Sequence, residues 1–181
     1  MKFETGKYYH LYNRSNNKEI VFHEKENYHY FLQQYQKFVS QYFTTVAYCL
    51  MPTHFHFLVK ANNESDEVNT TIGRWLSSYT KAINKRYERQ GSLFQPHTKA
   101  KNIDDESYLL TLITYIHQNP VRAGLVNHCS KWDHSSYQTY IGINGNRFVD
   151  TSLLLHYFKN KESYVKYADE LLTTVRKEFW I

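Results

Sequence analysis

Residues 43–60 constrain the fold most, because their pattern is that of a β-hairpin. Residues 43–50 (FTTVAYCL) are rich in β-branched and aromatic side chains, as strands are, and Pro52 interrupts the run. Residues 54–60 (HFHFLVK) then predict the returning strand. Two strands joined so closely pair antiparallel, so the sequence predicts an antiparallel sheet.

Two histidines, His54 and His56, give this hairpin its chemical interest. Side chains at i and i+2 of a strand point to one face, about 6–7 Å apart along the backbone, so both rings can converge on one ion. Imidazole is the commonest metal ligand in proteins. Phe55 and Phe57 fill the opposite, core-facing side. Two ligands are too few for a metal site, so a third is required from elsewhere, and structural histidines remain the alternative.

Length and composition fit a soluble domain with a substantial core. The chain has 181 residues, of which 41% are hydrophobic and 22% charged. A net charge of +5, with 17 tyrosines and 11 phenylalanines, suits a polyanionic partner whose bases stack on rings. Single-stranded nucleic acid has both properties, although most of the rings are expected to lie in the core.

Cysteine usage and the lack of long apolar segments indicate a cytoplasmic protein. Cys49 and Cys129 are the only cysteines, and no CxxC or Cys/His finger spacing occurs. The N-terminal residues lack the apolar stretch of a signal peptide. No run approaches the roughly 20 apolar residues of a membrane span, so we expect no membrane association.

The remaining pattern predicts an α+β domain. Besides the hairpin we expect a strand over residues 8–13, helices over 24–41 and 67–90, a short strand or hairpin over 93–100, a helix from Asp104 or Asp105 to about Gln118, and helices over 151–158 and 162–177. Residues 127–145 are expected to be irregular. Pro120 disfavours a helical conformation at Asn119, so that helix is expected to end there.

Tyr115 and Asn119 supply a candidate nucleophile and a candidate third ligand. Positions four apart lie nearly over one another on a helix, and Tyr115 falls at the edge of the apolar stripe. Asn119 offers a carbonyl oxygen, which suits a hard ion such as Mg²⁺ or Mn²⁺. His117 lies about 160° from Asn119 on the helical wheel and is not expected to converge. The alternative for Tyr115 is a stacked, half-buried tyrosine.

Together these residues indicate phosphodiester chemistry. A metal held by two histidines and an amide oxygen polarises a phosphodiester as a Lewis acid. A tyrosine then attacks phosphorus and gives a covalent phosphotyrosine and a free 3′-hydroxyl. Free tyrosine has a pKa near 10, so the hydroxyl needs help from the ion or from a base. The covalent bond keeps the energy of the broken linkage, which favours strand transfer over hydrolysis.

Four motifs resemble the single-tyrosine HUH transposases, and in particular the branch of the REP-associated tyrosine transposases. They are PTHFHFLV (52–59), GSLFQ (91–95), YIHQNPVRAGLV (115–126) and WDHSSY (132–137), and the resemblance covers roughly residues 8–167. It implies an α+β fold of ferredoxin-like type. It also implies a Mg²⁺- or Mn²⁺-dependent single-strand DNA endonuclease that recognises hairpin-forming repeats.

The resemblance assigns roles to individual residues. His54 and His56 form the HUH pair, Tyr115 is the nucleophile and Asn119 the amide ligand. Candidates for DNA contacts are Arg14, Lys81, Lys85, Arg86, Lys99 and Arg122, for which a solvated surface is the alternative. Pro96 and His97 stand where a basic residue is expected, which affects local DNA contacts and not the catalytic set. His10 is interpreted as a packed strand histidine rather than a ligand.

We therefore expect a metal-dependent single-strand DNA endonuclease and transposase that cleaves at hairpin-forming repeats through a covalent 5′-phosphotyrosine. Residues 1–145 are expected to form the catalytic domain, and residues 146–181 its C-terminal helical extension. The alternatives are a DNA-binding regulator of the same fold without transposition, and a metal-dependent phosphoesterase that uses water. The sequence leaves open the DNA target, the metal, and whether the protein is a monomer or a homodimer.

Overall fold

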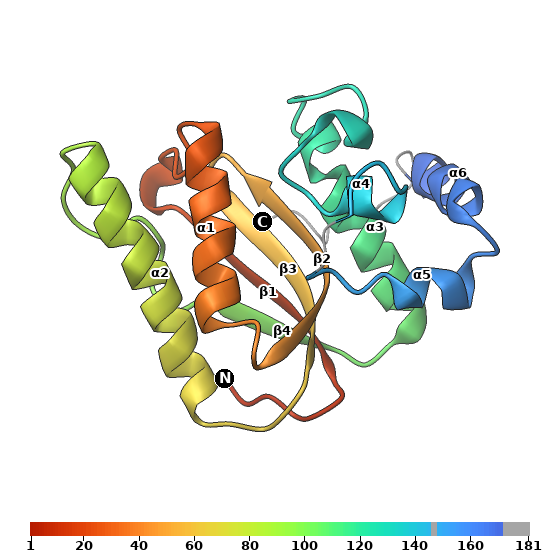
Figure 1. The fold of residues 1–181 in the computed structure, drawn as a ribbon, viewed down its shortest axis with the longest axis horizontal. Helices are drawn as coiled ribbons and strands as arrows, with labels where there is room; N and C mark the ends of the chain where they lie inside the picture. The colour runs from red at the N-terminus through yellow and green to blue at the C-terminus, as the bar shows by residue number, and fades with distance from the viewer. Residues whose placement is uncertain (146–147, 172–181) are drawn as a thin grey trace.

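An antiparallel sheet forms the centre of the fold (Figure 1). The computed structural model describes residues 1–145 and 148–171. The four strands are β1 (Tyr8–Arg14), β2 (Phe43–Met51), β3 (His54–Ala61) and β4 (Lys99–Ile103), in the spatial order β2-β3-β1-β4. With a helix after β1 and another after β3, this is the β-α-β-β-α-β arrangement of ferredoxin-like folds. The predicted α+β class is confirmed.

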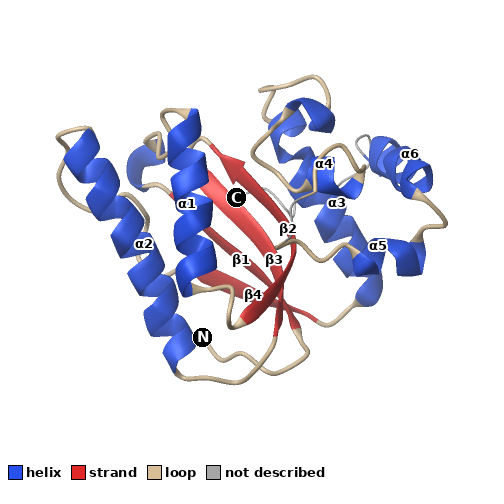
Figure 2. Ribbon diagram, viewed as in Figure 1, coloured by secondary structure: helices blue, strands red, loops and turns tan. Residues whose placement is uncertain are grey.

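Two long helices cover one face of the sheet (Figure 2). These are α1 (Lys25–Phe38) and α2 (Glu67–Arg86), which lie side by side. Between them and the sheet the ring centroids of Phe31 and Phe55 are 5.2 Å apart, and those of Trp75 and Phe57 are 5.7 Å apart. Such pairs contribute about 0.5–1.5 kcal/mol beyond their buried area. The alternation in β3 thus directs its phenylalanines to this core, as predicted.

The opposite face of the sheet carries α3 (Glu106–Arg122), with α4 (Tyr137–Tyr140), α5 (Ser152–Tyr157) and α6 (Lys161–Leu171) further out. Buried hydrogen bonds join α6 to α3. His117 Nδ1 lies 2.6 Å from the Tyr164 hydroxyl, and Gln118 Nε2 donates to the carbonyl of Ala168. Helix α6 therefore packs against the side of α3 that faces away from the sheet.

The predicted end of α3 at Asn119 is wrong, because the helix continues through Pro120 to Arg122. Pro120 lies in the last turn, where its fixed φ is compatible with a helix and only one ladder hydrogen bond is lost. The helix ends at Arg122, and the chain turns away at Gly124, whose φ of 69° lies in the left-handed region that glycine adopts without strain. Asn119 consequently has a helical neighbour on both sides.

The strand predicted over residues 93–100 is also misplaced, since β4 begins only at Lys99. Leu93 and Phe94 are buried, but they belong to a loop that is joined to the end of β1 by isolated contacts, such as the bridge between Phe94 and Ser15 and the bond from Gln95 N–H to the Arg14 carbonyl. β4 has the sequence KAKNI and lies at the edge of the sheet. Lysine-rich edge strands lack the apolar pattern from which strands are predicted.

The other predicted elements are confirmed with ends shifted by a few residues, and the segment 127–145 is irregular apart from α4 and a short 3₁₀ turn at Cys129–Lys131. The last part of the helix predicted over 162–177, from residue 172 on, lies outside the described residues, as does residue 146, where the predicted extension starts.

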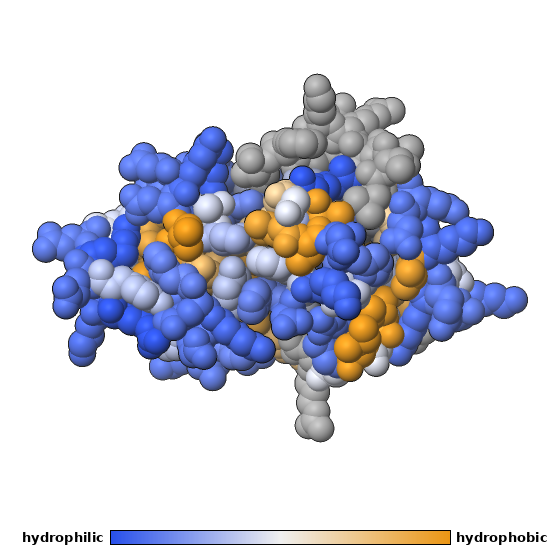
Figure 3. Space-filling view, turned by 90° about the horizontal axis from the view of Figure 1, so that it is seen from above, coloured by the Kyte–Doolittle hydropathy of each residue, from blue (hydrophilic) through white to orange (hydrophobic). Residues whose placement is uncertain are grey.

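None of the described helices combines the length and apolar character of a membrane span. Viewed from above, the surface is mostly hydrophilic with separate hydrophobic patches (Figure 3).

Candidate active site

His54 and His56 lie on the face of the sheet that α1 and α2 leave uncovered. Their ring centroids are 5.1 Å apart and the rings are perpendicular. His56 is completely buried, whereas His54 is partly exposed. The spacing that predicts a shared face therefore brings the two imidazoles together.

The two nitrogens of His56 have different environments. Nδ1 lies 2.9 Å from Nε2 of His10 on the neighbouring strand. Nε2 is buried and has no hydrogen-bond partner among the described residues. Leaving a buried polar atom unpaired costs about 1–3 kcal/mol, so such an atom calls for a ligand. Nε2 of His56 is accordingly a candidate ligand atom.

Both histidines are neutral at physiological pH. Burial, and next the charge of Arg14, lower the pKa of His54 to about 4. Burial, followed by the neighbouring His10 and His54, holds the pKa of His56 well below its usual value. Neutral imidazole is the form that binds a metal ion. His54 Nδ1 lies 3.0 Å from the Thr53 hydroxyl, which leaves Nε2 as its candidate ligand atom.

Tyr115 on α3 packs its ring against His56. The two centroids are 5.9 Å apart at an interplanar angle of 80°, and the tyrosine is 4% exposed. Burial raises the pKa of Tyr115 to about 12, an effect that the charge of Arg122 and a side-chain hydrogen bond with Asn119 partly offset. The phenol is therefore protonated at neutral pH.

Asn119 lies one helical turn after Tyr115 and on the same side of α3. It is largely buried, and its Nδ2 donates to the backbone carbonyl of Tyr115 at 2.9 Å. His117 points the other way, with Nδ1 against Tyr164 and Nε2 2.7 Å from the Ser136 hydroxyl. The structure thus places Tyr115 against His56, with Asn119 one turn further along α3, while His117 is engaged by Tyr164 and Ser136.

The side chains that could bind a metal ion at this site are histidines and an asparagine. No cluster of three or more His, Cys, Asp or Glu side chains occurs in the described parts of the chain. Two neutral imidazoles and an amide oxygen are therefore the candidate donors here. This combination of nitrogen and oxygen suits a divalent ion with further positions left for substrate and water.

Some of the predicted DNA-contacting residues share the face of the histidines. In the sheet register Arg14 is opposite His54, and Lys99 of β4 is opposite Tyr12. Arg122 stands at the end of α3, where its guanidinium donates to Oε1 of Gln118 and to the carbonyl of Leu171. Arg14 and Lys99 are exposed and extend the site along the sheet.

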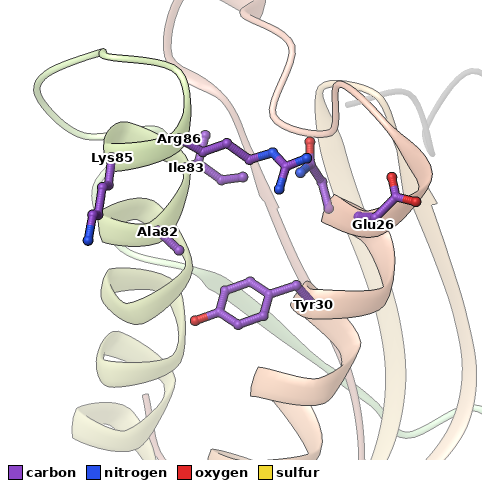
Figure 4. Close-up of a pocket in the computed structure, with 7 residues that line it drawn as sticks. Glu26, Tyr30, Ala82, Ile83, Lys85 and Arg86 are labelled. Carbon is purple, nitrogen blue, oxygen red and sulfur yellow. The ribbon is translucent and has the colours of Figure 1, made fainter.

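The basic residues of α2 lie in the layer on the other side of the sheet and are not brought to Tyr115. Arg86 reaches across to α1, where its Nη2 lies 2.7 Å from Oε1 of Glu24, while Lys85 points away from α1 (Figure 4). Lys81 lines a separate surface pocket of about 590 Å³, to which Pro96 also contributes. His97 lines a neighbouring pocket beside α2.

The contact between His10 and His56 is the feature of the candidate site that sequence reasoning missed. His10 is 6% exposed and its ring stacks on that of His56 with centroids 5.1 Å apart. The alternation of β1 places His10 on one face with Tyr12, but only the register between β1 and β3 shows which neighbour it meets. The sequence identifies His10 as a strand residue, but it does not reveal the register that sets its neighbour.

Comparison with known proteins identifies the family. The family described as "Transposase IS200 like" matches residues 4–119. A Haemophilus influenzae protein described as a REP-associated tyrosine transposase is 26% identical over 117 residues, which span 59% of this chain and 66%, just under two thirds, of that protein. A solved structure of a REP-associated tyrosine transposase bound to a REP hairpin superposes with a TM-score of 0.63 at 17% identity, covering 83% of this chain and 90% of that one. The first match spans more than half of the chain and includes the histidine pair, Tyr115 and Asn119, so the chain belongs to the IS200-like transposase family.

Proposed function

We propose that this protein is a metal-dependent single-strand DNA endonuclease and transposase that cleaves at hairpin-forming repeats through Tyr115. One observation carries the proposal: the Tyr115 ring packs on His56, whose Nε2 is buried without a partner among the described residues. Family membership supports the transposase activity, and the fold relative bound to a REP hairpin supports the substrate.

The residues at the site fit a divalent cation such as Mg²⁺ or Mn²⁺. Nε2 of His54, Nε2 of His56 and Oδ1 of Asn119 are the atoms that would hold it. Because Asn119 Nδ2 is engaged by the Tyr115 carbonyl, Oδ1 is the amide atom left for this role. When bound, the ion would polarise the scissile phosphate and neutralise the charge that builds on it.

Tyr115 acts as the nucleophile. Its Oη attacks phosphorus, a bond forms between them, and the bond from phosphorus to the 3′ oxygen breaks. The phenol loses one proton and the departing 3′ oxygen gains one, so the products are a 5′-phosphotyrosine and a free 3′-hydroxyl. Since burial raises the pKa of Tyr115 to about 12, its proton must leave as the new bond forms. The reverse reaction with another 3′-hydroxyl rejoins strands.

Arg14 and Lys99 mark the path that we propose for the single strand. Both extend from the face that carries His54 and His56. Basic side chains bind phosphates without reading sequence, and aromatic neighbours such as Tyr12 offer stacking surfaces. Lys81, Lys85 and Arg86 lie across the sheet, so contacts made by them would belong to a different part of the hairpin.

The test is incubation with hairpin-bearing oligonucleotides and Mn²⁺, followed by denaturing electrophoresis and peptide mapping. The wild type is expected to cleave and to carry a denaturation-resistant adduct on Tyr115. Tyr115→Phe removes only a hydroxyl, so it should fold and bind DNA while losing both products. His54→Ala should lose metal-dependent cleavage with the fold nearly intact. Tyr108→Phe on the same helix is the matched control and should keep both activities.

The same experiment separates the alternatives. Cleavage by Tyr115→Phe without an adduct would mean that water is the nucleophile, as in a phosphoesterase. Hairpin binding without cleavage by the wild type would indicate a DNA-binding regulator. An adduct that maps to another tyrosine, such as Tyr137, would retain the chemistry and reject Tyr115.

A further inference from the structure

A second histidine lies directly behind the candidate metal site. His10 on β1 is buried, and its Nε2 is 2.9 Å from Nδ1 of His56 on β3. The rings of His10 and His56 are nearly parallel, at 21°, and the Tyr12 ring lies beside His10 at a tilt of 36° with centroids 4.8 Å apart. The contact joins neighbouring strands of the central sheet, which are among the most rigid parts of such a fold.

We propose that His10 is a positioning residue that fixes the orientation and the tautomer of His56, so that Nε2 of His56 presents its lone pair to the divalent ion. This inference rests on the proposed function. A single proton lies between the two nitrogens. If it resides on Nδ1 of His56, that atom donates to His10, and Nε2 is the unprotonated nitrogen. If it resided on His10, the proton of His56 would be on Nε2, which could then bind no ion.

Nε2 of His56 has no partner in the described part of the chain, and this favours the first arrangement. A buried N–H without an acceptor would be left unsatisfied, whereas a bare nitrogen can be satisfied by a cation. Metal-bound histidines ordinarily donate their second N–H to a carboxylate, a carbonyl or water. Here an imidazole takes that place, so His56 is oriented without an added negative charge.

The two candidate ligands are therefore held in different ways. His54 is oriented by the hydroxyl of Thr53, its neighbour in the turn. His56 is oriented from another strand by His10, at a completely buried position. Loss of the buried contact is expected to affect metal binding more, because solvent cannot replace the lost acceptor.

The test measures Mn²⁺ alone, without DNA, by electron paramagnetic resonance of the free ion. His10→Leu is expected to weaken Mn²⁺ binding by about 10–100-fold, the usual effect of losing a partner behind a metal ligand. His10→Gln keeps an acceptor oxygen and should restore most of the affinity. His134→Leu replaces a histidine stacked on Tyr28, away from the site, and should leave Mn²⁺ binding unchanged.

Nitrogen-detected imidazole NMR of the metal-free protein gives a readout that a merely structural role would not change. We expect the Nδ1–H tautomer for His56 in the wild type and in His10→Gln, and a population of the Nε2–H tautomer in His10→Leu. An Nε2–H tautomer in the wild type, or unchanged tautomer and affinity in His10→Leu, would overturn the proposal. A wild type that binds no Mn²⁺ would overturn the metal site itself, while the tautomer would still decide the role of His10.

Discussion

Acid is expected to destabilise the fold through His117. This side chain is completely buried, with Nδ1 at 2.6 Å from the Tyr164 hydroxyl and Nε2 at 2.7 Å from the Ser136 hydroxyl. A neutral ring can donate with one nitrogen and accept with the other, whereas a protonated ring can only donate. Burial lowers the pKa of His117 to about 3, against about 6.5 in the unfolded chain.

The sign of the effect follows from these two values. Above pH 6.5 both states are neutral at this residue, so the full stability is present. As the pH falls below about 6.5, the unfolded chain binds a proton that the folded chain does not, and stability is lost until about pH 3. The loss from His117 amounts to about 2 kcal/mol at pH 5 and about 4 kcal/mol at pH 3.

The assay is urea unfolding followed by tryptophan fluorescence at several pH values between 7 and 4, with His117→Gln as the comparison. Glutamine does not titrate, so the free energy of unfolding of this variant should fall less steeply with acid than that of the wild type. The two slopes should differ by about 1.4 kcal/mol per pH unit. Other buried histidines, such as His134, contribute equally to both proteins and cancel in the difference. Equal pH slopes for the two proteins would refute the reasoning.

Two further predictions concern the DNA surface and the core. Lys99→Ala should reduce the slope of log K against log salt for single-stranded DNA by about 0.7, because it removes one phosphate contact beside the site. Lys85 lies across the sheet, so Lys85→Ala should not change binding to an unpaired strand. A filter-binding salt series with both variants decides this, and equal effects would reject the proposed path. Trp75→Ala should lower the free energy of unfolding by about 3–5 kcal/mol, since the indole is completely buried and donates to the Phe31 carbonyl. Chemical denaturation at neutral pH measures this free energy, and a decrease of less than about 1 kcal/mol would contradict the packing of Trp75 described above.

The parts of the site that the sequence predicts are those set by local periodicity. A strand has a period of two, so His54 and His56 share a face whatever the rest of the chain does. A helix has a period of 3.6, so Tyr115 and Asn119 lie together and His117 lies apart. Each of these relations holds within one element, and the structure reproduces them.

The parts that could not be predicted depend on how elements meet. The bond between His10 and His56 requires the register of two strands that are distant in sequence. The basic residues of α2 form a charged helix face, but their spacing does not say which side of the sheet that helix covers. The position of β4 could not be predicted, because its pairing with β1, rather than an apolar pattern, makes it a strand.

Helix α3 links the chemistry to the stability of the fold. Its sheet-facing side carries Tyr115, and its opposite side is bonded to α6 through His117 and Gln118. Because these residues are neighbours on one rigid helix, a shift of α6 changes the position of the phenol relative to His56. Displacement of a reacting group by about 1 Å can cost about 100-fold in rate. Because folded His117 binds a proton only near pH 3, its bond to Tyr164 persists at milder acidity, and cleavage should decline with acid together with the folded fraction.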